Sequence, residues 1–205
     1  MSKEILNLKP TRLWKHFYDL NQIPRPTGQM KEATKFVIDF GKSLGLETKQ
    51  DKAGNVVIIK PATSGMENAP IVILQSHLDM VPQKNNDVKH DFTKDPIEMV
   101  IEGNKVKAKS TTLGSDNGIG VAAIMAILED NSLKHGKLEA LFTIDEEVGM
   151  IGAFGLQPGF LSGNILLNLD TEEIGELCVG CAGGADVNAD WEYKDVEVPE
   201  GDIAY

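Results

Sequence analysis

Apolar positions near the start of the chain recur with the period of amphipathic helices. Residues 11–22 (TRLWKHFYDLNQ) have this spacing, and the proline-containing stretch 23–26 ends it. Thr27 is placed to cap a second helix whose apolar stripe continues to Leu44, and Gly45 follows where a helix C-cap belongs. We therefore expect two successive helices before the first strand.

Short apolar runs farther along the chain predict strands that alternate with helices. The Ala-rich run 118–129 predicts a buried helix, residues 149–156 (GMIGAFGL) predict a short helix, and residues 98–109 predict a hairpin that turns at Gly103-Asn104. Continuous apolar strands between helices are typical of an α/β fold, here a mostly parallel sheet with helices on both faces. The expected strands are LETKQ (46–50), VVIIK (56–60), IVILQ (71–75), LEALFTI (138–144) and NILLNL (164–169).

The pattern changes after residue 184. Residues 185–205 (ADVNADWEYKDVEVPEGDIAY) alternate apolar and polar positions, as a half-exposed strand does. We therefore expect one domain to occupy residues 1–184 and a second domain to start within residues 185–205.

Composition limits the kind of partner the chain can have. Of its 205 residues, 41% are hydrophobic and 25% are charged, as in soluble globular proteins. The net charge of −11 argues against a nucleic-acid partner. No apolar run reaches the ~20 residues that cross a bilayer, and the first residues lack the pattern of a secretory signal. Cys178 and Cys181 are too few for a disulfide framework, and we expect both to be buried and unpaired. These features predict a cytoplasmic protein with no nucleic-acid or membrane partner.

Side chains that can bind metal ions follow three of the predicted strands and precede one predicted helix. Ligands of open α/β sheets bind beyond the carboxyl ends of the strands, so these side chains should share one edge of the sheet. Carboxylates gathered in one cleft repel one another unless they are neutralised, as by a divalent metal ion. Mixed imidazole and carboxylate ligands suit zinc, with manganese and cobalt as alternatives. The candidate residues are His77, Asp79, Asp116, Glu146, Glu147 and Asp170.

Each candidate also has an ordinary structural explanation when it is taken alone. Asp116 could cap the following helix, and Glu146-Glu147 could open a helix whose dipole favours acids. The joint placement at one sheet edge favours the metal site. Residues 118–123 (GIGVAA) match a degenerate dinucleotide fingerprint, but the polar stretch before them does not form the strand which that motif needs, so we exclude nucleotide binding.

Several longer motifs occur together in a fixed order. They resemble the co-catalytic di-zinc peptidase family that includes aminoacylases, carnosinases and bacterial di- and tripeptidases. Within that family the resemblance is to the aminoacyl-histidine (Xaa-His) dipeptidases, and it covers nearly the whole chain. The motifs are SHLDMVPQKN (76–85), STTLGSDNGIGVAA (110–123), LFTIDEEVGMIGA (141–153), LLNLDTEE (166–173) and GCAGG (180–184).

The resemblance implies two metal ions held by four side chains of this chain. His77 and Asp170 would bind one ion, Asp116 would bridge both ions, and Glu147 would bind the second. The peptide bond after the bridging residue, Asp116-Asn117, is expected to be cis in this family. Zinc is the expected metal.

The resemblance also implies a catalytic base and a substrate class. Asp79 would hold the His77 imidazole in the required tautomer, and Glu146 would be the general base that activates a water shared by the two metal ions. The implied reaction is hydrolysis of small dipeptides, Xaa-His dipeptides such as carnosine in particular.

The family has a second domain, a lid that also forms a homodimer, and a last metal-binding histidine after it. By this resemblance residues 1–184 are the amino-terminal part of the catalytic domain, and residues 185–205 begin the lid. His16, His90 and His135 lie in unsuitable positions for the last ligand. We therefore expect the 205-residue chain alone to bind metal weakly and to hydrolyse little.

Other activities remain compatible with these motifs. A tripeptidase or an N-acyl amino acid deacylase would use the same metal residues with a different lid. A catalytically incomplete fragment, or a binding module that keeps the fold of the metal site, is the alternative from another class.

Overall fold

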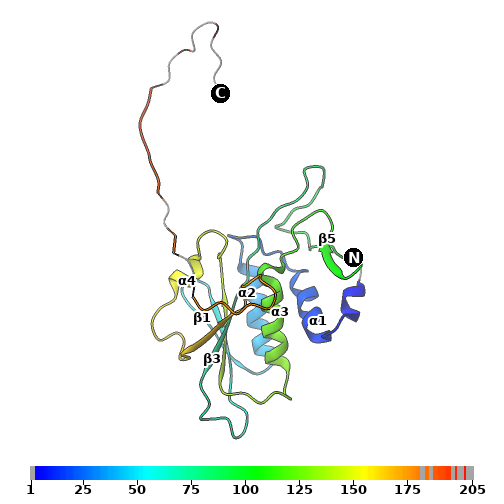
Figure 1. Ribbon diagram of the computed structural model, residues 1–205, viewed down its shortest axis with the longest axis vertical. Helices are drawn as coiled ribbons and strands as arrows, with labels where there is room; N and C mark the ends of the chain where they lie inside the picture. Colours follow the sequence, from blue (N-terminus) through cyan, green and yellow to red (C-terminus); the bar gives the residue numbers. More distant parts are fainter. Residues whose placement is uncertain (1–2, 181–182, 185–186, 195–196, 198–200, 202–205) are drawn as a thin grey trace. The chain divides into compact units, whose positions relative to one another are not determined.

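The computed structural model describes residues 3–180, 183–184, 187–194, 197 and 201. Contacts divide the chain into two units, Met1–Glu172 and Glu173–Tyr205. All helices and strands of the described residues belong to the first unit (Figure 1). Residues 185 and 186 lie outside the described residues, so the boundary expected after residue 184 stays a prediction.

The first unit is built on a sheet of strands β1 (Glu47–Gln50), β2 (Val56–Lys60), β3 (Val72–His77), β6 (Leu138–Thr143) and β7 (Ile165–Asn168). Their order across the sheet is β1-β2-β6-β3-β7 (Figure 1). β3 pairs in parallel with β6 and β7, whereas β2 pairs antiparallel with β1 and β6. Only β2 therefore runs against the other strands of this sheet, and the predicted α/β fold with a mostly parallel sheet is confirmed.

Two long helices, α2 (Lys31–Ser43) and α3 (Ser115–Glu129), pack against the same face of the sheet. Val37 of α2, Ile58 of β2 and Ile124 of α3 are fully buried in one core cluster. The opposite face is contacted by the loop 156–164, where Gly163 lies against Ile73. Helices were expected on both faces, but in the described part of the first unit the two long ones share a face, with α2 against β1 and β2 and α3 against β3.

The two helices at the start of the chain and a hairpin pack outside α3. The short 3₁₀ helix η1 (Lys3–Asn7) and helix α1 (Thr11–Leu20) form a second apolar cluster with α3, in which Phe17 and Ala122 are buried. The predicted hairpin is confirmed as β4 and β5, with Gly103-Asn104 at its turn, and the short helix expected near residue 150 is α4. Their bounds are β4 Met99–Glu102, β5 Lys105–Ala108 and α4 Ile151–Gly155.

Several local expectations need correction. Thr27 does not cap α2, which begins after Met30, because its hydroxyl donates instead to Asp79. Cys178 is exposed, since no described residue of its unit covers it, and Cys181 lies outside the described residues. Residues 187–194, expected to form a strand, have no partner strand among the described residues and form none.

β7 also departs from the expectation of a buried apolar strand. Its residues Ile165, Leu166 and Leu167 are 41%, 52% and 47% exposed. β7 lies at the edge of the sheet, beside β3, and no strand of the described residues pairs with its outer side. The apolar run alone does not show that β7 lies at the edge of the sheet or that its side chains are exposed.

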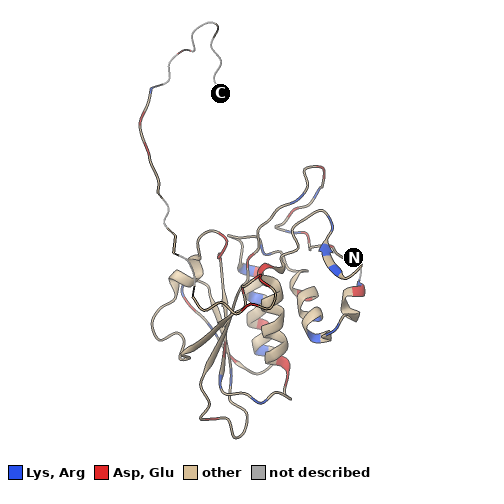
Figure 2. Ribbon diagram, viewed as in Figure 1, with Lys and Arg blue, Asp and Glu red and all other residues tan. Residues whose placement is uncertain are grey.

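The structure shows how the basic residues are distributed and whether any helix could span a membrane. Lys and Arg are distributed over several elements of the first unit, including α1, α2 and β5 (Figure 2). None of the described helices combines the length and the apolar character needed to span a bilayer.

The buried core predicts a clear contrast between two phenylalanines. Phe142 of β6 is fully buried, whereas Phe154 of α4 is 78% exposed. Phe142→Ala should lower the free energy of unfolding by about 3–5 kcal/mol, because it leaves a cavity. The control Phe154→Ala should change it by less than about 0.5 kcal/mol. Urea denaturation of the two variants checks this, and equal losses would contradict the assigned core.

Candidate metal centre

The candidate residues reach one edge of the sheet because three neighbouring strands run in parallel. β3 ends at His77, opposite Thr143, the last residue of β6. β7 pairs with β3 on its other side and is followed by Asp170. The segment after β6 carries Glu146 and Glu147. The candidate residues therefore lie at one edge of the sheet, as the sequence predicts, because the strands that they follow run in the same direction.

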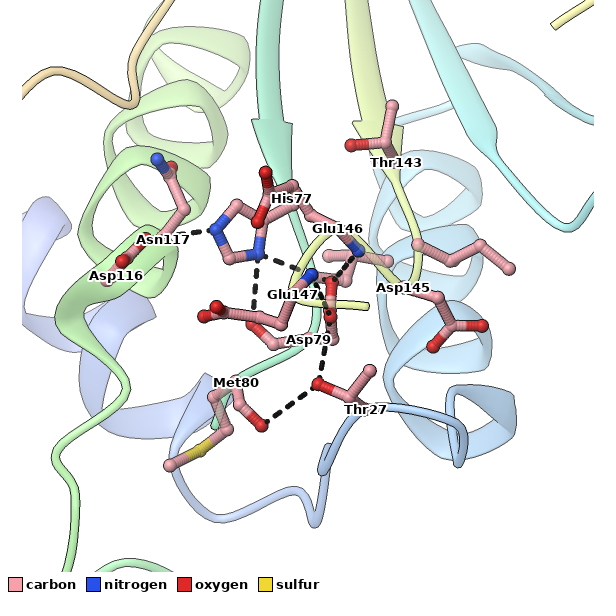
Figure 3. A network of polar contacts seen from close by, with 12 residues as sticks. Thr27, His77, Asp79, Met80, Asp116, Asn117, Thr143, Asp145, Glu146 and Glu147 are labelled. Carbon is pink, nitrogen blue, oxygen red and sulfur yellow. Dashed lines mark hydrogen bonds and ion pairs between the residues drawn. The ribbon is translucent and has the colours of Figure 1, made fainter. Parts of the chain in front are cut away.

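His77 lies at the centre of the polar contacts at this edge (Figure 3). The Nε2 atom of its buried ring is 2.9 Å from Asp116 Oδ1 and 3.6 Å from Asp170 Oδ1. On the other side of the ring, Nδ1 is 3.3 Å from Asp79 Oδ1 and 3.1 Å from the main-chain oxygen of Asp79. One ring nitrogen thus faces two carboxylates, and the other is anchored by Asp79.

Asp79 connects the histidine to the loop after β6. Its carboxylate is fully buried and accepts hydrogen bonds from the main-chain N–H groups of Glu146 (3.0 Å) and Glu147 (3.2 Å). The hydroxyl of Thr27 donates a third hydrogen bond to it, at 3.0 Å (Figure 3). These donors fix the carboxylate beside the imidazole, an arrangement that sets the tautomer of a metal-binding histidine.

Asn117 is a site residue that the sequence patterns did not single out. The peptide bond between Asp116 and Asn117 is cis, as the family resemblance implied. The Asn117 amide nitrogen donates to the Asp170 carboxylate and, at 2.9 Å, to the main-chain oxygen of Leu169. Gly120 leaves room for this side chain, because an added Cβ would lie 2.1 Å from Asn117 Oδ1. The start of α3 and the end of β7 are joined in this way.

The loop that carries Glu146 and Glu147 is held by hydrogen bonds within its own main chain and to neighbouring segments. Asp145 has a positive φ of 48°, and its carboxylate accepts a hydrogen bond of 2.7 Å from the N–H of Gly28. The N–H of Met150 donates to the main-chain oxygen of Glu146, and α4 starts one residue later. The two glutamates therefore stand on a short, closed loop between β6 and α4.

The proximity of these charges shifts several pKa values. Burial lowers the pKa of His77, but the hydrogen bond with Asp79 and the charge of Asp170 outweigh it and raise this pKa to about 9. Burial raises the pKa of Asp79, but His77 and two main-chain N–H groups outweigh it and lower this pKa to about 2. Burial raises the pKa values of Glu146, Glu147 and Asp170, as neighbouring carboxylates do also.

These residues fit a divalent cation. Ligand atoms of His77, Asp116 and Asp170 all lie within 4.8 Å of one another, as do those of His77, Glu146 and Glu147. Imidazole and carboxylate ligands suit zinc, and a cation would relieve the repulsion that raises the carboxyl pKa values.

The other histidines have structural contacts elsewhere. His16 Nε2 is 2.8 Å from Glu129 Oε2, which links α1 to α3. His90 packs edge to face with Phe92 at 4.5 Å between ring centroids. His135 Nδ1 is 2.7 Å from the main-chain oxygen of its neighbour Gly136. None of them joins the two candidate metal groups that the described residues form.

Several known proteins with similar sequences or structures are named as peptidases. The chain is 49% identical over 198 residues to the cytosol non-specific dipeptidase of Escherichia coli K12, which covers 97% of this chain and 41% of that protein. The aminoacylhistidine dipeptidase of Vibrio alginolyticus matches with a TM-score of 0.83 and 50% identity, over 84% of this chain and 35% of that one. A tripeptidase from Staphylococcus aureus matches with a TM-score of 0.66 and 25% identity, over 78% and 43%. The chain therefore spans less than half the length of these relatives.

The sequence match to a peptidase family includes the whole candidate site. Residues 73–187 match the family described as Peptidase family M20/M25/M40. This segment contains α3, β6, β7 and all of β3 but its first residue, the elements whose ends bring the candidate residues together. The chain therefore belongs to peptidase family M20/M25/M40.

Proposed function

We propose that this chain supplies the metal centre of a dipeptidase that hydrolyses small dipeptides with two divalent metal ions, of which zinc is the best candidate. The observation that carries the proposal is the convergence of His77 Nε2 with the carboxylates of Asp116 and Asp170 at the ends of parallel strands. The two dipeptidases named above, about 50% identical to the chain, support the substrate class.

Four side chains would hold the metal ions. His77 and Asp170 would bind one ion, Asp116 would be shared, and Glu147 would bind the other. Bound divalent ions supply an acidic water at neutral pH and polarise the carbonyl of the peptide bond. Asp79 would keep the His77 ring oriented, because its carboxylate lies beside Nδ1 while Nε2 faces the carboxylates of Asp116 and Asp170.

Glu146 would be the general base. Its main-chain N–H is fixed by Asp79, and its carboxyl group stands beside His77, Asp79, Asp116 and Asp170, whose charges influence its pKa. Burial raises that pKa, which brings the carboxylate closer to the range in which it can accept a proton from water and then return it to the leaving amine.

The finer parts of the proposal come from the relatives. We propose Xaa-His dipeptides as substrates because the structure of a named aminoacylhistidine dipeptidase is similar to this chain. A cytosolic location follows in the same way from the Escherichia coli relative. The expected homodimer concerns the lid domain of the family and stays a prediction.

Replacing the proposed base should remove catalysis and keep the metal. In the protein expressed from its complete reading frame, Glu146→Gln should lower kcat for Xaa-His dipeptides by about 10²–10⁴-fold, because the amide cannot accept the proton. Zinc content, measured by mass spectrometry, should stay at the wild-type value. Glu32→Gln on the exposed surface of α2 is the matched control and should leave kcat unchanged.

The same assay separates the candidate activities. Rates with an Xaa-His dipeptide, a tripeptide and an N-acyl amino acid should be highest for the dipeptide. Full activity of Glu146→Gln would refute the assignment of the base, and a preference for the acylated amino acid would refute the dipeptidase assignment.

Metal binding should also release a proton from His77. Because the pKa of this imidazole is raised to about 9, the ring is protonated at pH 7, whereas the metal binds its neutral form. Affinity for Zn²⁺ or Co²⁺ should therefore fall as the pH decreases from 8 to 6, by about tenfold per unit. Calorimetry in buffers of different ionisation enthalpy should count about one proton released per chain, on binding of the ion that His77 holds. His135→Asn, the control, should give the same count, and a count of zero in the wild type would contradict the prediction.

A further inference from the structure

Arg25 is a fully buried cation next to the candidate metal centre, and the proposed reaction does not use it. It is 1% exposed and lies between two prolines, Pro24 and Pro26. Its guanidinium Nη1 donates to the main-chain oxygens of Leu78 (3.0 Å) and Asp79 (3.3 Å). These two oxygens belong to the segment that directly follows His77.

The same guanidinium also reaches the segment before α3. Its Nη2 donates to the main-chain oxygen of Gly114 at 2.5 Å and to Asn21 Oδ1 at 3.1 Å. Gly114 is two residues before Asp116. One planar group thus joins the segment that carries His77 and Asp79 to the segment that carries Asp116.

The main chain around Arg25 strengthens the first of these two attachments. The N–H of Met80 donates to the main-chain oxygen of Arg25 at 3.2 Å, and the N–H of Thr27 donates to the main-chain oxygen of Met80 at 3.3 Å. The Thr27 hydroxyl donates to the Asp79 carboxylate (Figure 3). Residues 25–27 therefore contact the Asp79 segment through both main chain and side chains.

Two glycines of the GSDNG motif make room for the guanidinium. A Cβ at Gly114 would lie 2.4 Å from Arg25 Nη2, and a Cβ at Gly118 would lie 2.6 Å from the same atom. Gly114 also has a φ of 68°, a left-handed conformation that favours glycine. The need for glycine on either side of Asp116 is thus explained by the side chain of Arg25, which lies 89 residues before Gly114 in the sequence.

The charge of Arg25 is retained at neutral pH. Burial lowers its pKa to about 10, and the nearby charges of Asp79 and Asp116 oppose this decrease. An apolar side chain of similar volume would avoid the desolvation of a buried cation, so simple filling of the core does not require an arginine. An apolar side chain could not, however, satisfy three main-chain oxygens from two separate segments.

We propose that Arg25 is a positioning residue of the metal centre. Its guanidinium fixes the distance between the His77–Asp79 segment and Asp116, and so sets the spacing of the groups that receive the metal. This inference rests on the proposed metal site, but its effect on the spacing also exists in the metal-free chain and can be measured there.

Hydrogen exchange in the metal-free 205-residue chain tests the positioning directly. Arg25→Met should make the amides of Glu146 and Gly118 exchange about tenfold faster, because the guanidinium no longer anchors the two segments that carry their acceptors, the Asp79 carboxylate and the Gly114 carbonyl. Lys60→Met is the matched control. Lys60 is another cation that donates to main-chain oxygens, those of Ile127 and Asp130 at the far end of α3. The Lys60→Met variant should speed amide exchange near the end of α3 and leave the exchange rates of the Glu146 and Gly118 amides unchanged.

Cobalt binding gives the second readout. Under conditions in which circular dichroism shows each variant folded, Arg25→Met should weaken Co²⁺ affinity by about 10- to 100-fold and alter the visible ligand-field spectrum. Lys60→Met should retain both the wild-type affinity and the spectrum, although it also destabilises the fold. If Arg25→Met does not fold, Arg25→Lys replaces it in both experiments. Lysine keeps the charge but not the planar fork, so it should still speed exchange at Glu146 and Gly118.

The results distinguish a failure of the Arg25 proposal from a failure of the proposed metal centre. Wild-type exchange at Glu146 and Gly118 in the Arg25 variants would overturn the proposal for Arg25, whatever the metal result. Wild-type Co²⁺ affinity and spectrum in those variants would overturn it too. Failure of the wild-type chain to bind any divalent metal would count against the proposed metal centre, while the exchange data would still decide the positioning role.

Discussion

The parallel pairing of β3 with both β6 and β7 is the constraint on which the rest of the site depends. Each strand delivers its polar residues just beyond its carboxyl end, and parallel neighbours deliver them to the same edge. A reversed β7 would place Asp170 at the opposite edge, away from His77. The antiparallel strand β2 lies on the far side of β6 and contributes none of the candidate side chains.

The acidic groups gathered in this way repel one another, and two nearby basic side chains, His77 and Arg25, reduce that repulsion. His77 is buried between Asp79 on one side and Asp116 and Asp170 on the other. Arg25 donates to the main-chain oxygen of Asp79, and its charge interacts with the charges of Asp79 and Asp116. A protonated His77 is the internal counter-charge of the metal-free chain, and a bound divalent ion would take over that role.

The sequence predicted the α/β fold and the gathering of the six candidate residues at one end of the sheet, because strand ends are local features. The metal-binding and catalytic roles of these residues stay a prediction. His77, Asp116, Glu147 and Asp170 could be identified from what precedes or follows an apolar run. Thr27 was interpreted as a helix cap, a local role, whereas its hydroxyl binds a carboxylate 52 residues away. Arg25 and Asn117 gave no signal, since their importance depends on which distant main-chain groups they meet. The exposure of β7 was also unpredictable, because an apolar run does not indicate whether its strand lies at the edge of the sheet.

Anomalous X-ray scattering at the zinc edge, from crystals of the chain grown with zinc, tests the central claim most directly. The account predicts a strong peak within bonding distance of His77 Nε2 and the carboxylates of Asp116 and Asp170, with Asp79 still beside Nδ1. Zinc bound only at other histidines, such as His90 or His135, with none at the ends of β3 and β7, would contradict it.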